Sequence, residues 1–160
     1  MVGRCWSASC LRYAAVATLG LLLLGTLLPG AALSSPFPDS PDPRIISGFE
    51  FLPVGWLGPL SGHFGWYANP ALIAALYLPF QGRRPRLALS LLPILIASSC
   101  FVAMPIYLYN DPLPHWLSRF EAGFWIWYAA CAMPLAIWAM ACTPAFGSGE
   151  RRNAEMLARP

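Results

Sequence analysis

The sequence has no lysine and few charged residues of any kind. All ten basic residues are arginine, and acidic and basic residues together make up 11% of the chain, against about a quarter in soluble domains. Apolar residues make up 58%. This composition excludes an ordinary soluble protein and predicts that lipid surrounds most of the chain. Arginine without lysine is typical of a GC-rich coding sequence, which indicates a bacterial inner (plasma) membrane as the location.

The patterns that carry common chemistry are also missing. There is no CxxC pair, no GxSxG, no paired-histidine motif and no Asp pair inside an apolar segment. The net charge is +3, but the arginines are scattered beside apolar runs and form no continuous basic face. The sequence therefore predicts no catalytic residue, no metal, no cofactor and no nucleic-acid partner. We expect the cysteines to be free thiols: Cys5, Cys10, Cys100, Cys131 and Cys142.

Four segments are long and apolar enough to be considered as membrane helices, since a crossing needs roughly 20 apolar residues. They are residues 13–33, 59–80, 87–109 and 122–143. The predicted fold class is therefore all-α, a bundle of four transmembrane helices forming a single membrane domain over residues 1–160. Residues 34–58 are expected to form an outer linker, rich in proline, followed by an interfacial segment, and residues 144–160 a cytoplasmic tail.

The second segment is irregular. Its apolar run from Pro70 to Phe80 would rise only about 17 Å as a helix. A start at Pro59 gives enough length but includes His63 and Asn69. Either the helix continues through Asn69 and kinks at Pro70, which we favour, or it begins there after a re-entrant segment.

The arginines set the predicted orientation, because short cytoplasmic loops retain arginine. Eight of the ten fall on one predicted side: Arg4, Arg12, Arg83, Arg84, Arg86, Arg151, Arg152 and Arg159. Both termini are therefore expected in the cytoplasm. The first segment also resembles a secretory signal with small residues at 30–32, but its apolar run is longer than the usual 7 to 15 residues, so we favour a retained helix.

Two stripes of small residues occur at helical spacing. One comprises Gly58, Gly62, Gly65 and Asn69, and the other comprises Ala129, Ala132, Ala136 and Ala139. In lipid, small residues permit the close backbone approach on which helix association depends. We expect both stripes to lie in packed helix interfaces, either with each other or with other helices.

Polar residues of the predicted outer side form the second candidate site. They are His63, Asn69, Asp111 and His115, and their spacing matches no metal motif. An interfacial histidine satisfied by lipid headgroups is the simplest interpretation of His63, since no ionisable residue lies at mid-depth. Tryptophan and tyrosine crowd the same boundary, as expected of an interfacial aromatic belt.

Residues 55–60, GWLGPL, followed by 66–70, WYANP, resemble segments of small, uncharacterised bacterial multi-pass inner-membrane proteins. The resemblance implies a membrane location and carries no activity across. We expect a non-enzymatic accessory or interaction protein, whose partners are the lipid bilayer and another membrane protein or a second copy of the chain. The alternative is a small transporter or channel component that uses the broken second segment.

Overall fold

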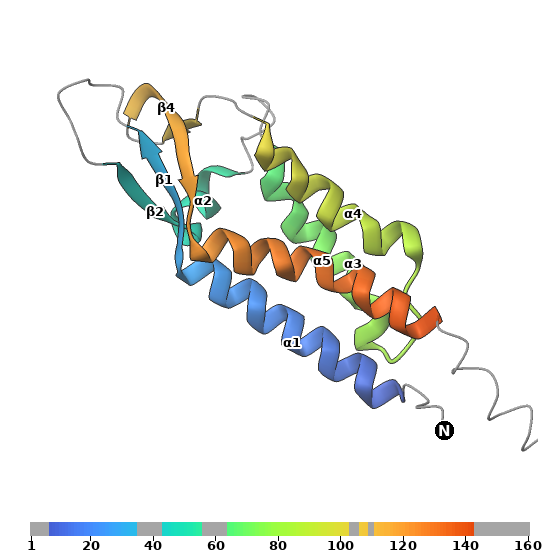
Figure 1. The fold of residues 1–160 in the computed structure, drawn as a ribbon. Helices are drawn as coiled ribbons and strands as arrows, with labels where there is room; N and C mark the ends of the chain where they lie inside the picture. The colour runs from blue at the N-terminus through green and yellow to red at the C-terminus, as the bar shows by residue number, and fades with distance from the viewer. Residues whose placement is uncertain (1–6, 35–42, 56–63, 103–105, 109–110, 143–160) are drawn as a thin grey trace, which may run out of the picture.

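The chain folds into a bundle of four helices with a small β-sheet at one end of it (Figure 1). This computed structural model describes residues 7–34, 43–55, 64–102, 106–108 and 111–142. The elements in chain order are α1 (Ala8–Leu27), β1 (Pro29–Ser34), β2 (Arg44–Ser47), α2 (Gly48–Gly55), the 3-10 turn η2 (Gly65–Tyr67), α3 (Ala68–Phe80), α4 (Leu87–Ala97), the 3-10 turn η3 (Ser98–Phe101), β3 (Ile106–Leu108), β4 (Asp111–Phe120) and α5 (Ala122–Cys142). A mostly helical fold is confirmed, but the all-α prediction is wrong because a sheet is present.

Helix α1 lies about five residues earlier than the predicted first segment. Ser7 caps it, since its hydroxyl accepts a hydrogen bond from the amide of Cys10 at 3.3 Å. The helix ends before Pro29 because a residue that precedes proline is disfavoured in helical conformation, and Leu28 is extended at φ −84° and ψ 162°. The prediction of helix up to residue 33 is therefore wrong, and residues 29–34 form β1 instead.

The residue at which α3 begins determines whether Pro70 kinks the helix or lies in its first turn. The α-helix begins at Ala68, directly after η2, so Pro70 lies in its first turn, where a missing N–H removes no helical hydrogen bond. The predicted kink in a continuous helix is not what these residues form. Residues 56–63, the first part of the predicted second segment, lie outside the described residues.

The predicted third segment is divided between helix and strand. Helix α4 and the 3-10 turn η3 together end at Phe101, and residues 106–108 form β3. Helical structure up to residue 109, as predicted, is therefore wrong. The fourth segment is confirmed as a helix, because α5 covers residues 122–142 of the predicted 122–143.

Two of the described helices are long and apolar enough to cross a membrane, not the four predicted. They are α1, with 20 residues, and α5, with 21. Helix α3 has 13 residues and α4 has 11, or roughly 20 Å and 17 Å of rise. The predicted segments were continuous in hydropathy, but in the structure 3-10 turns and prolines divide them into shorter helices.

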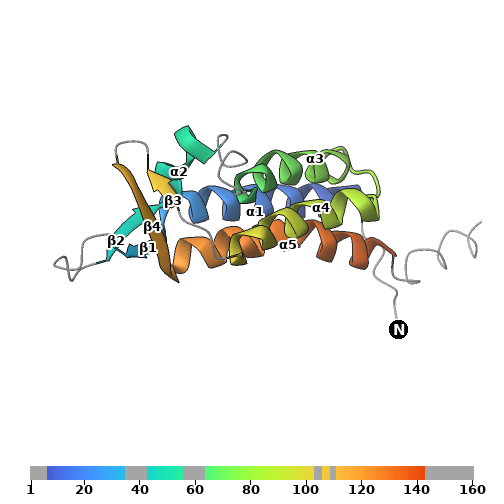
Figure 2. The same ribbon diagram turned by 90° about the horizontal axis from the view of Figure 1, so that it is seen from above.

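The four bundle helices lie side by side and alternate in direction. Helices α1 and α4 run toward the sheet and α3 and α5 run away from it, so the start of α1, the α3–α4 turn and the end of α5 share one end (Figures 1 and 2). Contact at that end is direct, because a Cβ atom at Gly82 would lie 2.7 Å from the Cβ atom of Ala8. Gly82 has φ +72°, a conformation that only glycine adopts without strain.

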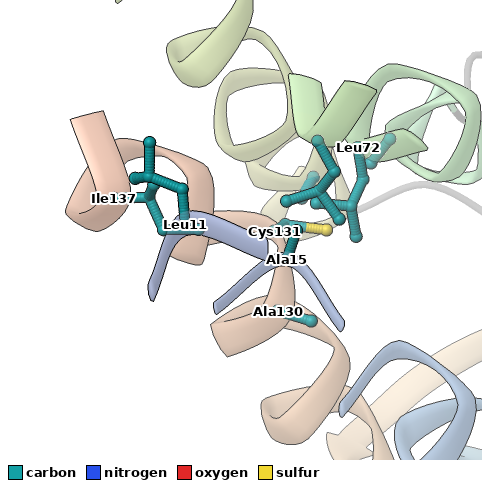
Figure 3. Close-up of a cluster of buried hydrophobic side chains, with 9 residues drawn as sticks. Leu11, Ala15, Leu72, Ala130, Cys131 and Ile137 are labelled. Carbon is teal, nitrogen blue, oxygen red and sulfur yellow. The ribbon is translucent and has the colours of Figure 1, made fainter. Parts of the chain in front are cut away.

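The core of the bundle is formed where α1, α3 and α5 meet, together with the end of α4. Its buried side chains are Leu11, Ala15, Ala68, Leu72, Leu76, Ala97, Ala130, Cys131 and Ile137. Figure 3 shows Cys131 of α5 pointing toward Leu72 of α3, with Ala15 of α1 beside it. Small residues at several of these positions let the helix axes approach closely.

The closest approach joins α1 to α5. A Cβ atom at Gly25 would lie 2.7 Å from the backbone nitrogen of Trp127, and one at Gly123 would lie 2.6 Å from the carbonyl oxygen of Pro29. These contacts involve backbone atoms on both sides, so no side-chain rotation could relieve them. The two glycines therefore fix where the two long helices cross.

The sheet is antiparallel, with strand order β2-β1-β4-β3. Ala31 of β1 pairs with Ile46 of β2 on one side and with Phe120 of β4 on the other. Beneath it Ala31, Leu33 and Ile46 form a small second core against which Phe51 of α2 and Leu117 of β4 pack. Part of the predicted outer linker is therefore ordered, as β2 and α2.

Candidate functional site

The two predicted stripes of small residues have different positions in the structure. Gly65 is buried, and Asn69 is half-buried, at the interface of α3 with α5. Ala129, Ala136 and Ala139 are exposed. The residues of α5 that face the bundle are instead Gly123, Phe124, Ala130, Cys131, Pro134, Ile137 and Ala141. Ala132 of the same stripe is half-buried, so among the described residues the alanine stripe lies mainly on the exposed surface of α5. Gly58 and Gly62 lie outside the described residues.

A polar junction, which we define as Gly65, Asn69, Ser98, Cys100, Trp127 and Tyr128, links three segments near the sheet end of the bundle. The indole N–H of Trp127 donates to Asn69 Oδ1 at 2.7 Å. The side-chain amide that sequence analysis placed near Pro70 thus has a partner on α5. This hydrogen bond joins α3 to α5 through two residues that are 58 positions apart in sequence.

A second pair of polar side chains joins η3 to α5. The Ser98 hydroxyl donates to the carbonyl oxygen of Ile94 at 2.7 Å, one turn earlier in the same helical segment. Ser98 Oγ also lies 3.0 Å from the hydroxyl of Tyr128. A hydroxyl has one hydrogen to donate, so with Ser98 committed to Ile94, Tyr128 is the donor of this bond.

Gly65 and Cys100, the remaining residues of the polar junction, pack against each other without a hydrogen bond between them. A Cβ atom at position 65 would overlap Cys100 Sγ, and it would lie 4.0 Å from the ring of Trp127. The thiol therefore occupies the space that a side chain at position 65 would need. The junction brings together uncharged hydrogen-bonding groups and one thiol, an arrangement that holds helices in register.

Two buried polar atoms beside the junction have no hydrogen-bond partner among the described residues: the indole nitrogen of Trp66, next to Gly65, and the hydroxyl of Ser99 on η3. The hydroxyl of Ser90, in the first turn of α4, is a third such atom. Each such group costs free energy in an apolar environment.

Of the predicted outer polar residues that the structure describes, Asn69 lies on α3, whereas the others belong to the sheet. Asp111 and His115 lie on β4, in the sheet, and His63 lies outside the described residues. His115 is only 4% exposed, and its Nδ1 lies 3.2 Å from the carbonyl oxygen of Ser34 on β1. Its position is that of a residue inside the sheet rather than one at the lipid surface. Among the described residues no group of three or more His, Cys, Asp or Glu side chains is placed to hold a metal ion.

An aromatic cluster surrounds the place where β4 leads into α5. Phe120 and Phe124 stack with ring centroids 3.8 Å apart, and Phe101 of η3 meets both rings edge to face at 5.4 and 5.7 Å. Phe101 and Trp125 remain about half exposed. The cluster lies at the sheet end of the bundle and includes Trp125, one of the tryptophans of the predicted aromatic belt.

Comparison of the chain with protein-family models, curated proteins and solved structures finds no match. The resemblance of residues 55–60 and 66–70 to small inner-membrane proteins therefore stays a prediction.

Gly25 and Gly123, which make close backbone contacts between α1 and α5, were not among the predicted packing residues. Each is a single glycine in an apolar run, without a glycine at a spacing of three or four on the same helix. They lie in the last turn of α1 and the first turn of α5, and the predicted segment 13–33 gave no signal for Gly25 because it ended six residues too late.

Proposed function

We propose that the chain is a multi-pass protein of the bacterial inner membrane, with its helix bundle in the bilayer and its sheet on the outer side. The observation that carries this proposal is the apolar exterior of the bundle. Arg12 is the one charged residue in α1, α3, α4, η3 and α5. Large apolar side chains point outward from each bundle helix, among them Leu23 at 61%, Ile73 at 58%, Leu95 at 64% and Trp125 at 52% exposure. A helix bundle in water would present charged residues there.

The distribution of charge supports the orientation. Arg12 and the arginines of the α3–α4 turn lie at the end of the bundle opposite the sheet. At the sheet end, Arg44 pairs with Glu50 and Arg119 pairs with Glu121, so the positive charges there are offset. Arginine is retained on the cytoplasmic side, so the proposal places the α3–α4 turn inside.

Membrane insertion and orientation are tested together by labelling with a membrane-impermeant maleimide. In intact spheroplasts, a cysteine at the exposed position 118 of β4 should react above the background of wild type, and one at position 84 in the α3–α4 turn should react only after permeabilisation. Equal labelling of both positions in intact cells would contradict the proposed orientation. Recovery of the protein in the soluble fraction would contradict insertion.

The role that we propose is that of a non-enzymatic accessory protein whose partner is another membrane protein or a second copy of the chain. The alanine stripe of α5 supports it, since Ala129, Ala136 and Ala139 present small, exposed side chains that the described part of the chain leaves uncovered. Small residues on a helix surface permit another helix to approach closely in lipid. The stripe thus offers a packing surface on the outside of the bundle.

A photo-crosslinking residue tests this role in native membranes. Placed at position 136, it should yield one distinct adduct, and placed at Val16, exposed on α1, it should yield less of that adduct. A second copy would give an adduct of twice the mass of the chain. Finding only the uncrosslinked chain at both positions would argue against the accessory role.

A small transporter or channel component is the second candidate, and the start of α3 favours it. The α-helix begins at Ala68 after a 3-10 turn, as a broken membrane segment would. Asn69 is then the polar group nearest the break. If this candidate is correct, Asn69→Ala should change solute flux in reconstituted vesicles, and unchanged flux with intact folding would remove its main support.

A further inference from the structure

The short helix α2 has apolar side chains on two sides. Phe51 packs into the small core beneath the sheet, whereas Phe49 is 61% exposed and Leu52 is 39% exposed. Phe49 and Leu52 are three residues apart, which places them on the same face of the helix. One face of α2 is therefore fixed to the sheet, and another is apolar and uncovered.

The start of α2 is held in place by its own sequence. Glu50 Oε1 accepts hydrogen bonds from the amide of Ser47 at 3.2 Å and from its hydroxyl at 3.3 Å. A Glu three residues after a Ser at the helix start is the pattern of a capping box. Arg44 pairs with the same carboxylate at 3.9 Å. The exposed face thus belongs to a defined helix whose nearby charges offset each other.

The position of α2 is set by contact with the end of α1. The amide of Gly48 donates to the carbonyl oxygen of Leu28 at 3.4 Å. A Cβ atom at position 48 would lie 2.9 Å from the Cα atom of Thr26. Helix α2 therefore begins beside the last turn of a 20-residue apolar helix, at the level where that helix would leave the hydrocarbon core.

We infer that α2 is an interfacial anchor that inserts Phe49 and Leu52 into the outer leaflet and so holds the sheet against the membrane. This inference rests on the proposed function, because the depth of α2 follows from α1 crossing the bilayer. The exposed face of α2 would contact lipid at the boundary between headgroups and acyl chains, where apolar faces of interfacial helices insert. Since Arg44 and Glu50 offset each other, insertion should not depend on anionic lipid.

The test places one environment-sensitive fluorescent residue at a time in the full chain, reconstituted in phosphatidylcholine vesicles. Probes at positions 49 and 52 should be quenched several-fold more by doxyl-labelled lipid than a control probe at Trp116. Trp116 is exposed and pairs with Ser34 at the sheet end farther from α1. Adding phosphatidylglycerol should leave the difference unchanged, and an appearance of quenching only with phosphatidylglycerol would overturn the inference.

A further probe at Leu23, exposed on α1, separates this inference from the proposed function. Strong lipid quenching at position 23 with water-like emission at positions 49 and 52 would overturn the anchor and leave membrane insertion standing. Water-like emission at position 23 as well would overturn both. Equal quenching at 49, 52 and 116 would also overturn the anchor, because it would mean that the whole sheet lies in lipid.

Discussion

At Gly25 and Gly123 the backbones of α1 and α5 approach so closely that even a Cβ atom would clash with backbone atoms. We expect Gly25→Ala and Gly123→Ala each to destabilise the protein by about 1–3 kcal/mol or more, because the added methyl must displace backbone. Thermal unfolding in detergent micelles measures the loss.

Gly20 is the matched control for this prediction. It lies on the same helix as Gly25, but a Cβ atom there would meet nothing within 4 Å. Gly20→Ala should leave stability unchanged or raise it by up to about 1 kcal/mol, since alanine is the better helix former. Equal losses at positions 20 and 25 would show that the close crossing is not the cause.

The contact between Gly65 and Cys100 predicts a rescue. Gly65→Ala should destabilise the protein because the new methyl overlaps Cys100 Sγ, and Cys100→Ala should remove most of that cost, since the remaining Cβ of residue 100 would lie 3.8 Å away. A double-mutant cycle should give a coupling energy of about 1 kcal/mol or more. Additive effects of the two substitutions would contradict the contact.

The hydrogen bond between Trp127 and Asn69 predicts a smaller effect. Trp127→Phe removes the N–H that donates to Asn69, at a cost of roughly 0.5–2 kcal/mol for an interhelical bond in lipid. Trp125→Phe is the control on the same helix, since Trp125 is 52% exposed and should tolerate the change. Chemical unfolding in mixed micelles compares the two variants.

At the residue scale, sequence reasoning located Asn69 and Gly65 but could not find their partners. Trp127 was interpreted as part of an interfacial belt, because indoles prefer that depth and nothing in the sequence links position 127 to position 69. The alanine stripe was predicted to lie in a helix interface, and three of its four residues are exposed on this chain. Alanine recurs throughout α5, so the sequence does not distinguish the stripe from the buried Ala130 and Ala141. Packing of the stripe against another chain stays a prediction.

At the scale of elements, hydropathy predicted where helices occur better than where they end. The 122–143 segment was predicted almost to the residue, because Glu121 precedes its apolar run and Pro144 follows it, so the sequence marks both ends. Pro29 and Pro70 shift the starts or ends of their helices, because proline removes a donor and restricts the residue before it. The sheet was missed because β1 is an apolar continuation of an apolar helix, and its partner strands lie more than ten residues away in sequence.

The packing of α1 predicts that the N-terminal segment is not removed by signal-peptide cleavage. Leu11, Ala15, Thr18 and Gly25 are buried against the rest of the bundle, so removal of α1 would expose the facing surface of α5. We expect the protein purified from membranes to retain its N-terminal segment, as intact mass spectrometry would show. A mass corresponding to cleavage near residues 30–32 would support the signal-peptide alternative.

At the scale of the whole molecule, apolar packing rather than charge holds the bundle. The described part of the chain has ion pairs between Arg44 and Glu50 and between Arg119 and Glu121, and both arginine side chains are more than half exposed. Exposed pairs contribute little, about 0–1 kcal/mol, and salt screens them. Raising the ionic strength should therefore change the unfolding free energy in detergent by less than about 1 kcal/mol, and a larger loss would indicate an electrostatic contribution that these pairs do not explain.

The pairing of α1 with α5 continues directly into the pairing of β1 with β4. One residue, Leu28, joins α1 to β1, one residue, Glu121, joins β4 to α5, and the amide of Glu121 donates to the carbonyl oxygen of Gly30 at 3.0 Å between them. Two helices and two strands thus form one uninterrupted ribbon. Because one residue joins each helix to its strand, a rotation of the two long helices about their crossing point should also move the sheet. Under the proposed membrane placement, a movement within the bilayer would thus be transmitted to the part of the protein outside it.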